Sequence, residues 1–208
     1  MPRPMQERAV RTRERILHAA AEVFDEYGYA GTSITRILER AGSTHGALYF
    51  HFKSKEDLAR AVIVEQARGL DLPKKPAGLQ QLVDLTLRLA FELQRSVLLR
   101  AGVRLAVEQE ESGLREYSVY ACWIDRFRRE LDEARQRGEL LPEVDETEFA
   151  RVLVASFTGT QVMSQIATRR ADLPERIALL WRYLLPGVAP AEVRERLVVA
   201  VERGRTPA

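Results

Sequence analysis

The chain has 208 residues, 46% of them hydrophobic, which suits one large or two small globular domains and excludes a disordered tail. Its 32 basic and 30 acidic residues leave a formal charge of only +2, so any surface that binds nucleic acid must be local. The single cysteine, Cys122, excludes an internal disulfide and fits a reducing compartment. No apolar signal segment and no window with roughly 20 apolar residues is present, so we expect a cytoplasmic protein without a membrane partner.

The first predicted helix covers residues 6–27, because apolar residues from Ile16 to Tyr27 recur at intervals of three and four and Gly28 follows them. Residues 1–15, which lead into it, contain five arginines and two glutamates, a local excess of positive charge. Arg11 in this segment is therefore a candidate for contact with nucleic acid. A solvated surface explains such a charge run about equally well.

Residues 33–52 predict a helix-turn-helix. Four apolar residues at helical spacing form one buried stripe, the hydroxyl of Thr32 or Ser33 can cap its start, and Gly42 ends it. Ser43 or Thr44 can then cap a second helix. Two helices joined by about three residues that include glycine have the geometry that places the second helix in the major groove of DNA. The stripe consists of Ile34, Ile37, Leu38 and Ala41.

The second of these helices has an apolar and a polar side. Leu48 and Phe52, four residues apart, are expected to pack inward. The outward side then offers hydroxyl and imidazole groups that can bond phosphate oxygens or base edges, and Gly46 lets a phosphate approach the backbone. Two short helices around a glycine turn also occur without DNA binding, so the pattern alone leaves both interpretations open. The outward groups belong to Thr44, His45, Tyr49 and His51.

A fourth helix and a boundary follow. Ser54 and Asp57 form a capping box that opens this helix and places Lys55 in its first turn, near the DNA side. Pro73 and Pro76, with the neighbouring glycines, then break the helical pattern. We therefore predict two domains: 1–68, a helix-turn-helix DNA-binding domain with its linking helix, and 69–208, a domain for ligand binding and dimerisation.

The second domain contains only helical patterns, so the predicted fold is all-α: a helix-turn-helix domain followed by a helical bundle. The apolar run 152–157 is short enough to be a strand. However, Asp145 and Glu148 form a capping box ahead of it and helical spacing continues to Ile166, which favours a helix. The predicted helices are 79–93, 97–107, 117–137, 146–166, 173–185 and 191–203.

A helix-turn-helix usually works as a dimer, because two-fold protein symmetry then matches a palindromic site. Residues 149–162 are apolar around more than half of the helix circumference, so one side can fill the core while another meets a second copy of the chain. The alternative is a fully buried helix in a monomer. The residues of this segment are Phe149, Val152, Leu153, Ser156, Phe157, Gly159, Thr160 and Val162. On the next helix, a four-helix interface would be completed by Ile177, Leu180, Trp181 and Leu184.

Residues 47–58, Ala-Leu-Tyr-Phe-His-Phe-Lys-Ser-Lys-Glu-Asp-Leu, preceded by Tyr27-Gly28-Tyr29 and Thr32-Ser33-Ile34, resemble the TetR family of transcriptional repressors. The resemblance implies a homodimer on double-stranded DNA with a palindromic operator. It implies phosphate contacts from Tyr49, His51 and Lys55, and contacts to bases or the adjacent backbone from the residues before them. Many relatives carry lysine in place of His45, so the operator cannot be inferred from them. The full set of predicted DNA contacts is Arg11, Thr32, Ser33, Thr44, His45, Gly46, Tyr49, His51 and Lys55.

A second resemblance narrows the family to a branch. Residues 46–52, residues 99–106 and Trp123 are similar to the receptors for γ-butyrolactones of filamentous actinobacteria. This resemblance implies a small hydrophobic effector in a mostly apolar pocket, with Trp123 stacked over it and Gln66 and Thr160 bonded to its polar head. Effector binding would favour a form with splayed reading heads and so release the DNA. The implied ligand contacts are Gln66, Leu85, Leu89, Trp123, Phe157 and Thr160.

Other classes of protein fit the sequence less well. All three histidines lie in the first quarter without carboxylates or cysteines at metal-ligand spacing, and there is no glycine-rich phosphate loop or nucleophile elbow. We therefore expect no enzyme, no metal and no cofactor. A helical adaptor would leave the polar side of the second helix without purpose. Within the family, the alternatives are a regulator of efflux or catabolic genes that senses an unrelated ligand, and an orphan regulator without a ligand.

Overall fold

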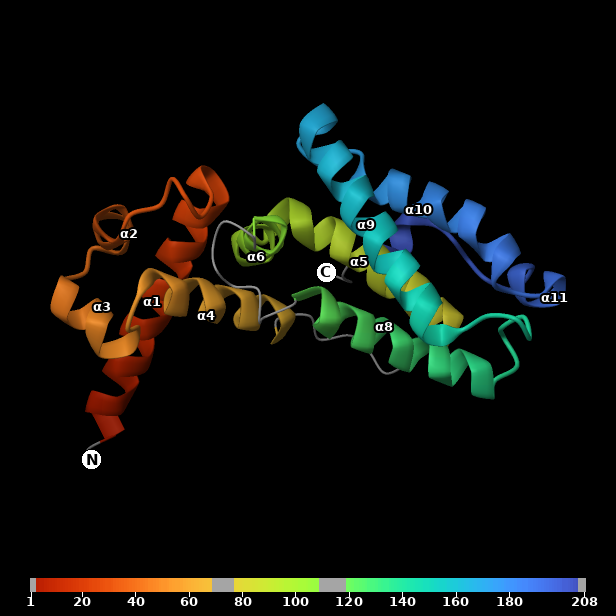
Figure 1. Cartoon of the computed structure of the whole chain (residues 1–208), viewed down its shortest axis with the longest axis horizontal. Coiled ribbons are helices and arrows are strands. Elements are labelled where there is room, and N and C mark those ends of the chain that lie inside the picture. The colour runs from red at the N-terminus through yellow and green to blue at the C-terminus, as the bar shows by residue number, and fades with distance from the viewer. Residues whose placement is uncertain (1–2, 69–76, 109–118, 206–208) are drawn as a thin grey trace. The chain divides into compact units, whose positions relative to one another are not determined.

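The computed structural model describes residues 3–68, 77–108 and 119–205 (Figure 1). Every regular element within those ranges is helical, which confirms the all-α fold. The predicted break at 73–76 lies outside the described residues. The chain forms two compact units, Met1–Asp71 with Ser96–Val119, and Leu72–Arg95 with Tyr120–Ala208.

The first unit is built on α1 (Arg3–Tyr27), the long red helix in Figure 1. Its apolar side, which includes Ile16, Val23 and Phe24, is fully buried against α2 (Ile34–Ala41), α3 (His45–His51) and α4 (Lys55–Arg68). A further helix, α6 (Val97–Val107), also packs on α1 and α4. A helix that follows residue 68 therefore belongs to the first unit, while the functional division at 68/69 stays a prediction.

Local hydrogen bonds set the limits of α2, α3 and α4. Ser33 Oγ accepts from Arg36 N at 3.2 Å, and Thr44 Oγ1 accepts from Ala47 N at 3.2 Å, so each caps the helix that follows it. Gly42 ends α2 with a φ of 55°, the left-handed conformation that glycine adopts most easily. Ser54 Oγ accepts from Asp57 N at 3.1 Å at the start of α4. These caps confirm the predicted helix-turn-helix and the helix after it.

The second unit contains α5 (Leu79–Arg95), α8 (Val119–Gln136), α9 (Glu146–Thr168) and α10 (Leu173–Leu184). Most of α5 is buried, and Thr86 Oγ1 on it accepts a 2.7 Å hydrogen bond from the indole of the fully buried Trp181 on α10. Asp145 Oδ1 accepts from Glu148 N at 2.8 Å, so the predicted capping box starts α9 and the ambiguous run 152–157 is helical.

The last predicted helix, 191–203, is wrong. After η1 (Leu185–Gly187), α11 (Ala191–Arg194) ends after four residues, and only the short 3₁₀ helix η2 (Val201–Gly204) follows. Gln80 of α5 binds both backbone groups of Val198: its Oε1 accepts from the N–H at 2.8 Å, and its Nε2 donates to the carbonyl at 3.1 Å. These tertiary bonds replace helical ones in a segment whose β-branched residues have only modest helix propensity.

Candidate nucleic-acid interface and ligand site

The outward side of α3 carries most of the predicted DNA contacts. Thr44, His45 and Gly46 are exposed, and Tyr49 is 53% exposed. The His45 and Tyr49 rings lie edge to face, 6.3 Å apart, which places both on one side of the helix. A Cβ added at Gly46 would meet no atom within 4 Å, so packing inside the protein does not require glycine there. The side opposite to the buried Leu48 is therefore open to a partner.

Phe50 is a residue that the sequence interpretation missed. It is 78% exposed, and its ring lies edge-on to the half-buried His51 at 5.0 Å. The signal was present, because a residue two positions before the buried Phe52 in a helix points away from the core. An exposed phenyl group beside the polar side chains of α3 can contact the methyl group of thymine.

Ser33 and Thr32 have different surroundings although they are neighbours. Ser33 is exposed, and its hydroxyl keeps a hydrogen to donate while it caps α2. Thr32 is only 4% exposed, and its hydroxyl donates to the Gly28 carbonyl at 2.6 Å. The Thr32 side chain therefore closes the turn between α1 and α2, and we remove it from the proposed DNA contacts.

The Lys55 ammonium binds protein groups. It donates to the Tyr29 carbonyl at 2.8 Å and the Thr32 carbonyl at 3.0 Å, and it lies 4.1 Å from the centre of the Tyr29 ring. Burial lowers the pKa of this ammonium below its usual value. Lys55 thus fastens the start of α4 to the turn between α1 and α2. Its contact with a phosphate stays a prediction and would use its remaining N–H.

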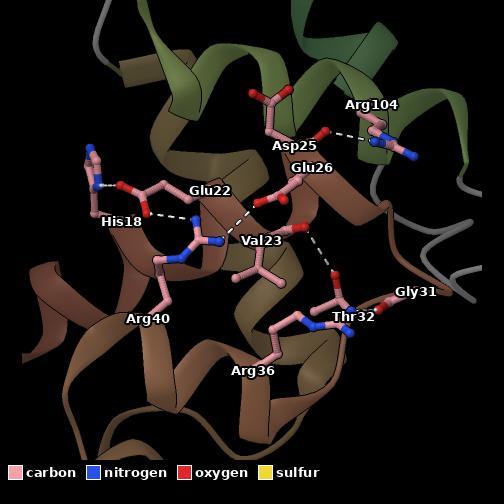
Figure 2. A network of polar contacts seen from close by, with 10 residues as sticks. All are labelled: His18, Glu22, Val23, Asp25, Glu26, Gly31, Thr32, Arg36, Arg40 and Arg104. Carbon is pink, nitrogen blue, oxygen red and sulfur yellow. Dashed lines mark hydrogen bonds and ion pairs between the residues drawn. The ribbon is translucent and has the colours of Figure 1, made fainter.

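Ion pairs hold α2 against α1 (Figure 2). Arg40 on α2 bonds Glu22 at 3.1 Å and Glu26 at 2.9 Å, and His18 lies 3.2 Å from the same Glu22. Arg36 donates to the Gly31 carbonyl at 2.8 Å. Each exposed pair is worth little by itself, but several that share one arginine restrict how α2 can rotate on α1. The network therefore orients the helix-turn-helix.

On the other side of α1, residues of α6 bind the C-terminal end of α1. Arg100 bonds the Asp25 carboxylate at 2.7 Å, and Arg104 donates to the Asp25 carbonyl at 2.7 Å. Glu108 accepts from Tyr29 N at 2.7 Å and from Arg104 at 2.8 Å. We call these four side chains, Asp25, Arg100, Arg104 and Glu108, the α1–α6 latch. The turn it holds is the one that Lys55 binds from α4.

Gln66, on α4, also meets α6. It is 2% exposed, and neither its Oε1 nor its Nε2 has a hydrogen-bond partner. A Cβ added to Gly102 of α6 would lie 2.3 Å from the Gln66 Cδ, so only glycine leaves room for this amide. An unsatisfied buried amide costs about 1–3 kcal/mol. Such a group is a candidate for hydrogen bonding to a ligand.

The other five predicted ligand contacts belong to the second unit. Leu85, Leu89 and Phe157 are buried, while Thr160 and Trp123 are half-buried. The Trp123 ring lies 5.9 Å from the ring of Phe127 on the same helix. Gln66 is in the first unit, so the pocket that would unite the six residues stays a prediction.

Two parts of the chain match known protein families. Residues 16–62 match the family described as "Bacterial regulatory proteins, tetR family", and residues 77–190 match "Tetracyclin repressor-like, C-terminal domain". The chain belongs to the TetR family. Regulators of this family bind operator DNA as homodimers and respond to small molecules.

Several TetR-family relatives resemble the chain over most of its length. The A-factor receptor protein of Streptomyces griseus is 43% identical over 184 residues, which are 88% of this chain and 66% of the receptor. The solved structure of TylP, a TetR regulator from Streptomyces fradiae, is 45% identical with a TM-score of 0.86 over 95% of both chains. CprB from Streptomyces coelicolor, solved with its operator sequence, is 30% identical with a TM-score of 0.75 over 97% of this chain and all of its own.

A TetR-family dimer needs a self-complementary surface, and α9 and α10 pack side by side with exposed apolar residues. As predicted, one side of α9 fills the core, where Phe149, Leu153 and Phe157 are buried. The interface predicted on the next helix was partly wrong, because Ile177 and Trp181 point toward the core of the subunit and are buried there. The exposed residues, which we call the α9–α10 surface, follow helical spacing and include Ile166 at 81% and Tyr183 at 78%. They are Val152, Met163, Ile166, Leu179 and Tyr183.

Residues 3–68, 77–108 and 119–205 hold neither a candidate metal site nor a membrane-spanning helix. No three histidine, cysteine, aspartate or glutamate side chains there are grouped so that they could hold a metal ion. Nor does any of the described helices combine the length and apolar character needed to cross a membrane.

Proposed function

We propose that this TetR-family protein is a transcriptional repressor that a small hydrophobic signal of the γ-butyrolactone class releases from a palindromic operator. The observation that supports this effector class is the extent of the similarity: the A-factor receptor match covers 88% of the chain and so includes the bundle as well as the DNA-binding head. A structure described as a gamma-butyrolactone receptor is 34% identical with a TM-score of 0.76 over 95% of this chain and 98% of its own. The proposed function needs no catalytic step and places the protein with the DNA, in the cytoplasm.

Regulators of drug efflux are less similar to this chain. AcrR of Shigella flexneri is 43% identical over only 58 residues, 28% of this chain and 27% of its own. SmeT, solved with triclosan, is 26% identical with a TM-score of 0.71 over 88% of this chain and 93% of its own. The AcrR match covers little more than a quarter of the chain, and the SmeT match is less identical than the gamma-butyrolactone receptor match. An efflux-type or orphan regulator is therefore the less favoured alternative.

We assign the DNA contacts by the chemistry and exposure of α3. Tyr49 and His51 are proposed to hold phosphates, and Thr44 and His45 to contact bases, with Gly46 leaving the backbone accessible. Arg11, Ser33 and Lys55 complete the proposed set. Two such heads, one from each subunit, would read successive major grooves about 34 Å apart.

The dimer is proposed to form through the α9–α10 surface. Large exposed apolar side chains on two adjacent helices are unfavourable in water and become favourable when a second copy covers them. A two-fold axis through this surface would bury the same residues on both subunits.

The proposed mechanism is a shift between two populations of the dimer. A ligand whose polar head bonds Gln66 would satisfy its buried amide and change the packing of α4 on α6. Because α6 holds the end of α1 through the α1–α6 latch, this change would reach the helix-turn-helix. A coupling free energy of about 1–3 kcal/mol is typical of such systems.

The test is a gel shift on the upstream region of the protein's own gene, with and without a synthetic γ-butyrolactone. We expect the wild type to bind and the lactone to release it. Trp123→Ala should bind the DNA equally well but resist release. Release of this variant at the wild-type lactone concentration would contradict the assigned pocket. A wild-type shift that no lactone changes would favour the efflux-type or orphan alternative.

A further inference from the structure

One side of α1 changes charge halfway along the helix. Residues 8, 11, 15, 22 and 26 are separated by three, four or seven positions, so they share this side. The first three are Arg8, Arg11 and Arg15, and the last two are Glu22 and Glu26. We call the three arginines the basic stripe. Arg8 and Arg15 are about 10 Å apart along the helix axis at 1.5 Å per residue.

The two halves of this side have different partners. Arg40 of α2 binds both glutamates of the acidic half, as Figure 2 shows. All three arginines of the basic stripe are exposed, and none forms a side-chain ion pair or hydrogen bond with any residue that the structure describes. In contrast, Arg36 and Lys55 in the same unit bind backbone carbonyls. The basic stripe therefore has no ion-pair partner among the described residues.

The basic stripe shares its side of α1 with the contacts that α2 makes. The stripe lies on the side of α1 to which Arg40 binds α2. A short turn joins α2 to α3. Figure 1 shows α1 passing close to α3. The end of α3 contacts the opposite side of α1, where the Arg13 guanidinium lies 5.2 Å from the centre of the Phe52 ring. A polyanion bound along α2 would therefore meet the basic stripe on the side of α1 that both share.

We infer that the basic stripe binds backbone phosphates of the operator outside the major groove that α3 reads. This adds Arg8 and Arg15 to the predicted Arg11 and gives each head a second anchor. It rests on the DNA-binding face proposed for α3. The charge of the stripe and its position on the α2 side of α1 favour DNA as the occupant, because DNA bound to the helix-turn-helix would also meet this side.

Salt dependence of DNA binding distinguishes phosphate contacts from a merely solvated charge. Each phosphate contact contributes about −0.9 to the slope of log K against log salt concentration. A dimer carries two stripes, so Arg8→Gln or Arg15→Gln should each reduce the steepness of the slope by about 2. Binding should weaken by a similar factor on the operator and on scrambled DNA, since phosphates carry no sequence information.

Two further variants control the measurement. Arg95→Gln, at the exposed end of α5 in the second unit, removes the same charge and should leave the slope unchanged. Arg15→Lys keeps the charge and should retain most of the wild-type slope. Slopes for Arg8→Gln and Arg15→Gln that equal the wild-type slope would overturn the inference. If wild-type protein fails to bind its operator at all, the proposed function is overturned instead.

Discussion

Gln66 is buried without a hydrogen bond, in a position that Gly102 opens for it. Replacing it with leucine removes the unsatisfied amide and keeps a similar volume. We expect Gln66→Leu to raise stability by about 1–2 kcal/mol, because an unpaired buried polar group no longer has to be desolvated. That corresponds to a melting temperature about 2–8 °C higher for a chain of this size. Operator binding should persist while release by the lactone weakens.

Gln161 provides the matched control for this prediction. It is equally buried, but its Oε1 accepts from the Arg170 guanidinium at 3.1 and 3.2 Å. Gln161→Leu should lower the melting temperature, because it leaves a buried arginine with fewer partners. If Gln66→Leu lowers the melting temperature as Gln161→Leu does, Gln66 is satisfied in solution and its proposed role fails.

The roles on α3 can be separated by residue. Tyr49→Phe removes one hydroxyl from an exposed ring and should weaken binding several-fold on every DNA sequence, because a phosphate contact is lost. His45→Ala should instead change which bases are preferred. Selection of binding sites from a random DNA library measures both effects. The assignment is wrong if Tyr49→Phe alters base preference while His45→Ala leaves it intact.

At the scale of elements, the latch between α1 and α6 is the proposed path from ligand to DNA. Arg100→Gln and Asp25→Asn should each reduce the lactone-induced loss of affinity, and the double variant should be no worse than either single one. Operator affinities with and without lactone give the coupling for each variant. Arg128→Gln, which breaks two ion pairs within α8, is the control and should leave the coupling unchanged.

The corner between α9 and α10 depends on an ionised aspartate. Hydrogen bonds from the hydroxyls of Ser164 and Thr168 and from the Arg176 guanidinium lower the pKa of Asp172 from 3.8 to about 2. Since the folded pKa lies below the unfolded one, the stabilisation is present above about pH 4 and is lost as pH falls toward 2. Urea unfolding across this range should show a smaller decline for Asp172→Asn, and an identical decline would refute the assignment.

At the scale of the whole molecule, function depends on the association of two chains. Tyr183→Glu places a charge on the α9–α10 surface and should give a monomer in sedimentation experiments. The monomer should bind the full operator far more weakly than the wild type does. Val198→Glu, at an exposed apolar position outside that surface, should remain dimeric. A dimeric Tyr183→Glu protein would place the interface elsewhere.

Much of the head could be predicted from local signals. The caps of the three helices bond to backbone groups only a few residues away, as does the left-handed Gly42 that ends α2. Local residue types therefore suffice to define the helix-turn-helix. The capping residues are Ser33, Thr44 and Ser54. Helical periodicity likewise predicted that Leu48 is buried and that His45 is exposed. The same rule applied to Phe50 would have predicted its exposure.

Long-range contacts decided the rest. Thr32 and Lys55 look like free polar groups in the sequence, yet they bind carbonyls of the turn between α1 and α2, up to 26 residues away. The sequence at the end of the chain has a helical pattern, but no long helix forms there. Instead, Gln80, 118 residues earlier, hydrogen-bonds both backbone groups of Val198. The latch on Asp25 joins residues 75 or more positions apart. Helical periodicity records which side of a helix is apolar, but only packing determines which distant group that side meets.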